Sequence, residues 1–213
     1  MNTRVYWLLR SSPAGRTIGR WAKPIAVLAA LIRAHDYSYP LPSQKRELLF
    51  RMAQDFDCRE FVETGTFRGD TAAFMAGRGL RCTTIELEPD LAELARRRFE
   101  AGQSVRVLEG DSSVILPSVI SELREAGLFW LDAHCSSGTT AGGGLAPPLL
   151  TELGLVLRDH RFDHCVGIDD ARDLLGLNGY PTLTDVAALV SAHRPYYAVR
   201  LVADVVLIAP ARM

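Results

Sequence analysis

The sequence predicts an α/β fold: a doubly wound, mostly parallel sheet of seven strands with helices on both faces. Two observations support this prediction. From residue 43 onward, short apolar strand patterns alternate with amphipathic helical patterns, which is typical of consecutive βα units. The last two strand patterns, 196–202 and 204–210, are too close together for a helical crossover, so we expect them to pair antiparallel as a closing hairpin.

The remaining elements follow in order along the chain. The helix expected over 89–102 has Pro89 near its start and Gly102 past its end, the usual asymmetry of helix termini. The helix expected over 112–127 contains Pro117, where it should bend or restart. The other strands are expected at 60–65, 81–87, 104–111, 128–134 and 164–171, and the other helices at 44–56, 70–78, 147–160 and 182–193.

Composition indicates an ordinary globular chain. Its 213 residues are enough for one domain with its own core, and 48% of them are hydrophobic. The net charge of −1 gives no reason to expect nucleic acid as a partner, which would favour a basic face. Cys58, Cys82 and Cys165 stand in or beside apolar runs, so we expect reduced, buried thiols and a cytoplasmic location. Oligomeric state is open, and a homo-oligomer is one alternative.

Residues 1–42 form a basic segment ahead of the main domain at 43–213. No acidic residue precedes Asp36, and the apolar run "PIAVLAALI" is too short to span a bilayer. Two interpretations stay open for residues 1–35. One is an amphipathic helix that caps a site or makes peripheral contact with an anionic membrane. The other is an ordinary packing helix with an arginine-rich, solvated face.

Acidic residues stand at the end of every main strand except those of the hairpin. In an open parallel sheet, ligands bind outside the carboxyl ends of the strands. Acids are 25 of 213 residues, so this placement is unexpected by chance, although Asp also favours turns. The sequence therefore predicts a ligand site at this edge of the sheet. The strand-end residues are Glu63 with Gly65, Glu86, Asp111, Asp132, and Asp169 with Asp170.

The first strand-to-helix turn, "VETGTFRGDT", has features of a ligand-binding loop. Gly65 and Gly69 would let a ligand approach the backbone, and the following helix offers free N–H groups. The loop lacks the GxGxxG spacing for a pyrophosphate, and Glu63 favours a cationic group, unless it is simply a solvated strand end. Glu86 is placed to accept two hydrogen bonds from a ribose diol, and Asp111 to accept one from an adenine amino group.

The segments "ETGTFRG", "TTIELEPDLAELARRRF", "LEGDSS" and "FWLDAH", in that order, resemble the class I S-adenosylmethionine (SAM)-dependent methyltransferases over roughly residues 45–210. The resemblance implies a Rossmann-like fold and SAM as cofactor. The site residues that it implies are Glu63, Gly65, Thr66, Gly69 and Thr71 at the methionine end, Glu86 at the ribose, and Asp111 with Ser112 beside the adenine.

A second acidic group is expected where the fourth and fifth strands end side by side. Asp132 and the pair Asp169–Asp170 would repel one another unless a positive group lies between them. A hard divalent cation with oxygen ligands, such as Mg²⁺, is the natural candidate. The alternative makes Asp132 a cofactor contact and the Asp169–Asp170 pair a turn with a helix cap.

The motifs "LDAH" and "IDDAR" resemble those of the Mg²⁺-dependent small-molecule O-methyltransferases of the catechol and macrocin types. The resemblance implies methyl transfer to a hydroxyl of a small molecule, for example a sugar or glycan. The catechol type carries a lysine base three residues after the first acid, and here Cys135 occupies that place. His134 is therefore the expected base, unless it is only hydrogen-bonded in its loop.

Two further expectations concern the residues near these acids. The stretch "CSSGTTAGGGLAPP" is either a loop that closes over the substrate or a plain linker. Arg172 is expected to pair with Asp169 or Asp170. Two other functions stay open: a metal-dependent hydrolase that uses Asp132, His134 and the Asp169–Asp170 pair, and a non-catalytic, cofactor-binding regulatory protein.

Overall fold

The computed structural model describes residues 40–100, 102, 104–132, 148–177 and 179–211, together with the backbone of Tyr6 and Trp7. The strands are β1 (Tyr6–Trp7), β2 (Glu60–Thr64), β3 (Arg81–Glu86), β4 (Val105–Glu109), β5 (Gly127–Leu131), β6 (Cys165–Ile168), β7 (Tyr197–Val202) and β8 (Val205–Pro210). The helices are α2 (Pro42–Asp55), α3 (Asp70–Ala76), α4 (Pro89–Phe99), α5 (Ser112–Glu122), α6 (Leu149–Arg158), α7 (Leu183–His193) and a 3₁₀ turn, η2 (Ala171–Asp173).

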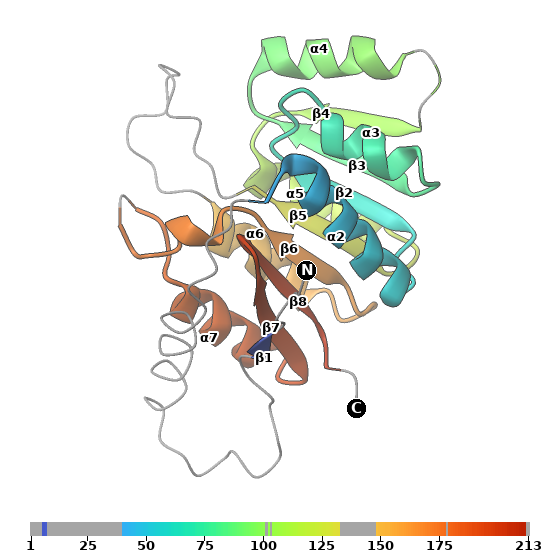
Figure 1. Ribbon diagram of the computed structural model, residues 1–213. Helices are drawn as coiled ribbons and strands as arrows, with labels where there is room; N and C mark the ends of the chain where they lie inside the picture. The colour runs from blue at the N-terminus through green and yellow to red at the C-terminus, as the bar shows by residue number, and fades with distance from the viewer. Residues whose placement is uncertain are drawn as a thin grey trace, which may run out of the picture.

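The strands form one sheet in the order β1-β7-β8-β6-β5-β2-β3-β4, which Figure 1 shows edge to edge. Strands β2 to β6 pair in parallel, whereas β8 pairs antiparallel with both β6 and β7. The predicted doubly wound sheet and its antiparallel hairpin are therefore confirmed. The two residues of β1, from the basic segment, add an antiparallel edge to β7. The rest of 1–39 lies outside the described residues, so the two interpretations of that segment stay open.

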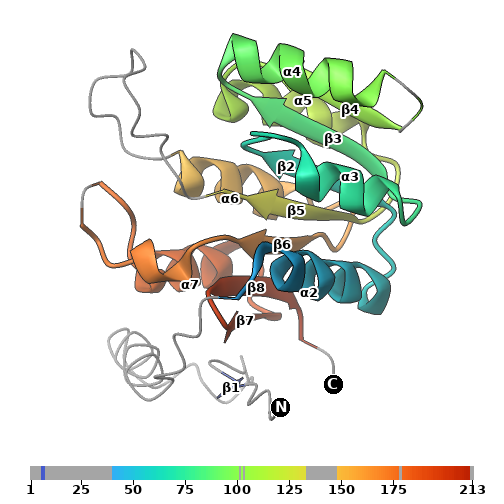
Figure 2. The ribbon, with the colours of Figure 1, turned by 45° about the horizontal axis from the view of Figure 1, so that its top comes forward.

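Helices cover both faces of the sheet. Helices α2, α3 and α4 lie on one face and α5, α6 and α7 on the other (Figure 2). Successive strand residues point to opposite faces, so Phe61 of β2 packs under α2 and α3 while Val62 packs under α5 and α6. The central strands are therefore buried on both sides, and only their ends are available to a ligand.

Gly167 in β6 sets how closely α2 approaches the sheet. A Cβ atom at this position would lie 2.6 Å from Cδ2 of Leu49 and 2.9 Å from Cε3 of Trp130. Glycine is therefore required here so that Leu49 can fill the space above the strand. Lys45 precedes Leu49 by one helical turn and shares its face, which directs Lys45 toward the carboxyl end of β6.

Helix α5 is one continuous helix through Pro117, so it does not restart at that residue. Cys58, Cys82 and Cys165 are buried, as expected. Among the described helices, none has the length and apolar character needed to cross a bilayer.

Candidate active site

The loop between β2 and α3 brings its backbone directly against Asp132. Gly65 has φ of 82° and Gly69 has φ of 72°, values that disfavour a side chain. A Cβ on Gly65 would lie 3.1 Å from Cβ of Asp132 and 3.2 Å from its Oδ2. Two residues predicted to bind the cofactor, Gly65 and Asp132, are therefore close together although they follow different strands.

Glu63 is a buried carboxyl at the end of β2. Its exposed fraction is 3%, and its Oε2 accepts a hydrogen bond of 3.0 Å from Oγ1 of Thr84. Thr84 in turn is hydrogen-bonded to Thr66 at 2.6 Å, so the predicted residues Glu63 and Thr66 share one network. Burial raises the pKa of Glu63 to about 8; hydrogen bonds from Thr84 and Thr71 oppose this shift, and the charge of Asp132 adds to it. The Glu63 carboxyl is therefore largely protonated near neutral pH, and a cationic ligand bound beside it would favour its ionised form.

Glu86 ties the loops after β2 and β3 together. Its Oε2 accepts from the backbone N–H of Phe67 at 2.8 Å, and its Oε1 accepts from that of Glu88 at 3.1 Å. Each carboxylate oxygen has two lone pairs, so both keep acceptor capacity. This geometry leaves Glu86 able to receive the ribose diol predicted for it.

Asp111 and Ser112 begin α5, and both already have partners. Asp111 is the N-cap: its Oδ1 accepts from the backbone N–H of Ser113 at 2.8 Å and from its hydroxyl at 2.6 Å. The Ser112 hydroxyl donates to Glu152 of α6. These contacts hold the start of α5 at the carboxyl end of β4, where the adenine is expected.

Glu152 is a buried acid of the candidate site that the sequence interpretation missed. Its exposed fraction is 2%, and besides Ser112 it has Thr64 Oγ1 as a donor at 3.5 Å. Burial raises the pKa of Glu152 to about 7, the two hydroxyl hydrogen bonds lower it, and the charges of Asp111 and Asp132 raise it. An acid within the apolar pattern "PPLLTELGLVL" was the signal that could have identified it.

Glu63, Asp132 and Glu152 together form what we call the acidic cluster. The charge of Asp132 contributes to the raised pKa values of both Glu63 and Glu152, so the three carboxyls interact electrostatically. Glu63 and Glu152 are buried and Asp132 is half-buried. Such a cluster favours a ligand with positive groups, because a carboxylate that has lost much of its hydration is stabilised by an opposite charge.

A different arrangement holds Asp169 and Asp170 at the end of β6. The ammonium of Lys45, from the first turn of α2, bonds Oδ1 of Asp169 and, at 3.0 Å, Oδ1 of Asp170. It also lies 3.6 Å from Oδ2 of Asp204 in the β7–β8 turn. Arg172 pairs with Asp170 at 2.8 Å, as expected, and with Asp204. We call these five residues the lysine cluster.

Within the lysine cluster, Lys45 and the aspartates stabilise one another's charged forms. Burial lowers the pKa of Lys45, but its hydrogen bonds and proximity to Asp169 and Asp170 outweigh burial and raise it. Burial likewise raises the pKa of Asp169, and the hydrogen bond from Lys45 opposes that shift. Lys45 is therefore an ammonium ion at this edge of the sheet.

The predicted Mg²⁺ site does not fit the described residues. Asp132, Asp169 and Asp170 were expected to converge on one cation, but no group of three or more His, Cys, Asp or Glu side chains in the described part of the chain could hold a metal. The physical reason is that Lys45 already lies between Asp169 and Asp170, where a dication would meet its ammonium. His134, the expected base, and the expected lid at 135–146 lie outside the described residues.

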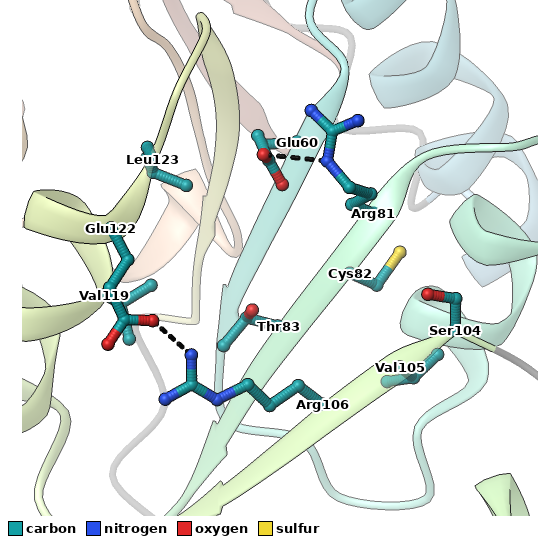
Figure 3. A pocket seen from close by; sticks show the side chains of 10 residues that line it. All are labelled: Glu60, Arg81, Cys82, Thr83, Ser104, Val105, Arg106, Val119, Glu122 and Leu123. Atoms are coloured by element: carbon teal, nitrogen blue, oxygen red, sulfur yellow. Dashed lines mark hydrogen bonds and ion pairs between the residues drawn. The ribbon is translucent and has the colours of Figure 1, made fainter.

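A cavity of about 380 Å³ lies at the opposite edge of the sheet (Figure 3). It is bordered by Glu60, Arg81 and Val105, which begin β2, β3 and β4. Ion pairs join Glu60 to Arg81 at 2.9 Å and Arg106 to Glu122. Because it faces the amino ends of the strands, this cavity is separate from the acidic cluster.

No family model matches the sequence, and no curated protein matches it. Solved structures do resemble the chain. O-methyltransferase TomG from Streptomyces achromogenes, involved in tomaymycin synthesis and in complex with SAM, is 20% identical over 82% of each chain, with a TM-score of 0.57. An O-methyltransferase from Bacillus cereus in complex with SAH is 17% identical over 92% of this chain and 94% of that one, with a TM-score of 0.58. Cofactor-bound Rv0187 from MTB is 21% identical over 88% of each chain, with a TM-score of 0.55.

The likeness concerns the fold, at identities too low to carry more. It spans most of this chain and most of each of these three neighbours. The Rossmann-like architecture expected from the sequence is thereby confirmed. This chain has the fold of SAM-dependent O-methyltransferases.

Proposed function

We propose that this protein transfers the methyl group of SAM to a hydroxyl group of a small molecule. The acidic cluster is the observation that supports this most. SAM carries a sulfonium and an ammonium, and both positive groups suit buried carboxyls beside a loop of exposed backbone. Glu63 is buried, has a raised pKa and lies two residues before Gly65, so it is the group best placed to receive the ammonium.

The other cofactor contacts follow from the strand ends. Glu86 would hold the ribose through the acceptor capacity that its two backbone hydrogen bonds leave. The start of α5, held by Asp111 and by the bond between Ser112 and Glu152, would flank the adenine. Asp132 would contact the cofactor from β5, because it lies against Gly65. These positions supply the positioning on which methyl transfer depends.

The acceptor hydroxyl would lie beyond Asp132, next to the end of β6. Bound in this site, SAM would supply an electrophilic methyl group: the O–C bond forms as the C–S bond breaks, and the electron pair stays on sulfur. The hydroxyl proton passes to a base, for which His134 stays a prediction. A sugar or glycan as acceptor is likewise a prediction.

Mg²⁺ assistance is not part of the proposal, because Lys45 lies between the two aspartates that were expected to bind the ion. A hydrolase built on a metal at Asp132, Asp169 and Asp170 is disfavoured for the same reason. The cytoplasmic location, peripheral membrane contact through 1–35 and homo-oligomer formation stay predictions.

Cofactor binding is the first test. We expect S-adenosylhomocysteine to raise the melting temperature of the wild-type protein, and calorimetry to give one site per chain. Glu63→Gln should weaken binding at least about tenfold, because a charge-assisted hydrogen bond is lost. Glu60→Gln is the matched control, since Glu60 begins the same strand at the opposite edge of the sheet. Absence of any effect of S-adenosylhomocysteine would contradict the proposal.

Methyl transfer is the second test. Radiolabelled SAM would be incubated with panels of sugar, phenol and lipid hydroxyl acceptors, and labelled products separated. We expect one class to accept label and Glu63→Gln to slow its labelling, whereas binding of the cofactor without transfer to any acceptor would favour a regulatory protein.

A further inference from the structure

We propose that Lys45 takes the place of a divalent cation at the end of β6: its ammonium, held by Asp169 and Asp170, binds the acceptor hydroxyl, and methyl transfer proceeds without a bound metal. The inference rests on the proposed transfer to a hydroxyl and concerns the acceptor side of that same site.

The geometry accounts for the position of the charge. The ammonium bonds Asp169 and Asp170, and these bonds join α2 to residues more than 120 positions later in the chain. The Lys45 side chain is 14% exposed, so it is largely enclosed but not sealed from solvent. Its partners Asp170 and Asp204 are 7% and 6% exposed, whereas Asp169 is 20% exposed, so two of the three negative charges lie deeper than Lys45 and one lies beside it near the surface.

The donors of Lys45 leave room for a ligand. An ammonium has three N–H groups, and two of them bond Asp169 and Asp170. Oδ2 of Asp204, at 3.6 Å, lies beyond hydrogen-bond distance. Among the described residues, the third N–H therefore has no closer acceptor, and it can donate to an oxygen of the acceptor.

Lys45 and Arg172 already neutralise most of the negative charge of the lysine cluster, so no metal is needed to balance it. Asp169, Asp170 and Asp204 contribute three negative charges, and Lys45 with Arg172 contributes two positive ones. A dication added to this group would lie within a few ångströms of an ammonium ion, and their repulsion in a partly buried site is unfavourable.

Packing, rather than the ion pairs alone, fixes Lys45. Leu49 fills the space that Gly167 leaves, and Lys45 lies one turn before Leu49 on the same helix face. The ammonium is therefore placed before any ligand arrives. A positive group that is already oriented stabilises the negative charge developing on the acceptor oxygen with little reorganisation.

Metal binding tests the occupancy of this position directly. Full-length wild-type protein, dialysed against a chelator, would be titrated with Mn²⁺ and free Mn²⁺ followed by electron paramagnetic resonance. We expect the wild type to bind none at this site and Lys45→Ala to bind one ion per chain. Arg51→Ala is the matched control, because Arg51 is an exposed cation on the same helix.

Two results of this titration would overturn the proposal. One is a Mn²⁺ ion bound by the wild type and lost in Asp169→Asn. The other is a Lys45→Ala protein that binds no more Mn²⁺ than the wild type. Lys45→Met, which keeps the apolar stem, replaces Lys45→Ala if that variant fails to fold, and binding of S-adenosylhomocysteine reports folding of each variant.

Kinetics give the second arm. We expect the wild-type rate to be unchanged by EDTA, and Lys45→Met to lower kcat on the order of 100-fold, the usual effect of removing one such donor. Affinity for S-adenosylhomocysteine should stay the same, and Arg51→Met should behave like the wild type. Loss of transfer in EDTA, or a full rate in Lys45→Met, would overturn the proposal. If no acceptor is methylated at all, the proposed function fails, whereas the Mn²⁺ titration still decides what occupies the position.

Discussion

Leu49 of α2 lies directly over Gly167 of β6, so close that a Cβ on the glycine would come within 2.6 Å of its Cδ2 atom. We expect Gly167→Ala to destabilise the protein by about 1–3 kcal/mol, because a methyl group forced into a filled space displaces its neighbours. Thermal or chemical denaturation measures this. Gly154→Ala in α6 is the control, since its Cβ would meet mainly the flexible end of Arg158 at 3.3 Å and should cost little. Equal stability of Gly167→Ala and wild type would show that the α2–β6 contact is loose.

Gly65 should matter for binding beyond its effect on stability. Gly65→Ala adds strain at φ of 82° and places a methyl group 3.1 Å from Asp132, so we expect loss of S-adenosylhomocysteine binding. Gly79→Ala is the control: φ is 89°, but nothing lies within 4 Å of its Cβ. Both variants should lose about 1 kcal/mol of stability through strained backbone. If calorimetry shows that Gly65→Ala still binds S-adenosylhomocysteine, the Gly65 loop does not contact the ligand.

Cofactor affinity should rise with pH up to about 8. Glu63 has a pKa of about 8 because it is buried, so at pH 7 most of the free protein holds it protonated. A cationic ligand favours the ionised form, and binding at pH 7 must then release a proton. Calorimetry in two buffers of different ionisation enthalpy measures that proton. Glu63→Gln should remove the release; the same release in the variant would assign the proton to another group.

Glu63 should also destabilise the unliganded protein at alkaline pH. Its pKa in the folded chain, about 8, is above the ordinary glutamate value of 4.5, so stability from the protonated form is complete below pH 4.5 and is lost as pH rises through 8. Glu63→Gln should therefore be more stable than the wild type at pH 8, on the order of 2 kcal/mol, and the two should differ least near pH 4. Denaturant titrations at both pH values check this, and a variant less stable at pH 8 would contradict it.

His164 should make stability fall in acid. It is buried, accepts from the backbone N–H of Gly127 at 3.0 Å and lies 3.0 Å from Asp159. Burial lowers the pKa of His164 more than Asp159 raises it, so its neutral form is favoured and its contribution, complete above pH 6.5, is lost as pH falls. Melting temperatures from pH 7.5 to 5.5 should decline less in His164→Gln. Exposed His160→Gln is the control and should follow the wild type.

The proximity of several candidate site residues could be predicted because strand ends in a parallel sheet meet at the same edge. Gly65, Glu63 and Asp132 follow apolar strands whose order a parallel sheet restricts, and the structure brings them together. Glu152 was readable in principle, as an acid on an apolar helix face. Lys45 was not, because its sequence neighbours form an ordinary amphipathic helix and its partners lie 124 and 125 residues away. The sequence predicted that Asp169 and Asp170 would lie at a strand end beside a positive group. It did not reveal that this group is the ammonium of Lys45.

The hairpin that closes the sheet also determines when the site can exist. Because β8 runs antiparallel to β6, the turn before β8 brings Asp204 to the same edge as Asp169. The lysine cluster therefore joins the first described helix to the last strands of the chain. During synthesis from the N-terminus, Lys45 is made long before Asp169, Asp170 and Asp204. It can form these ion pairs only after the last strands have been made and have docked on the sheet. The Gly65 loop after β2, by contrast, depends on strands that are synthesised earlier. The lysine cluster, on the acceptor side of the site, should therefore be the last part of the molecule to form.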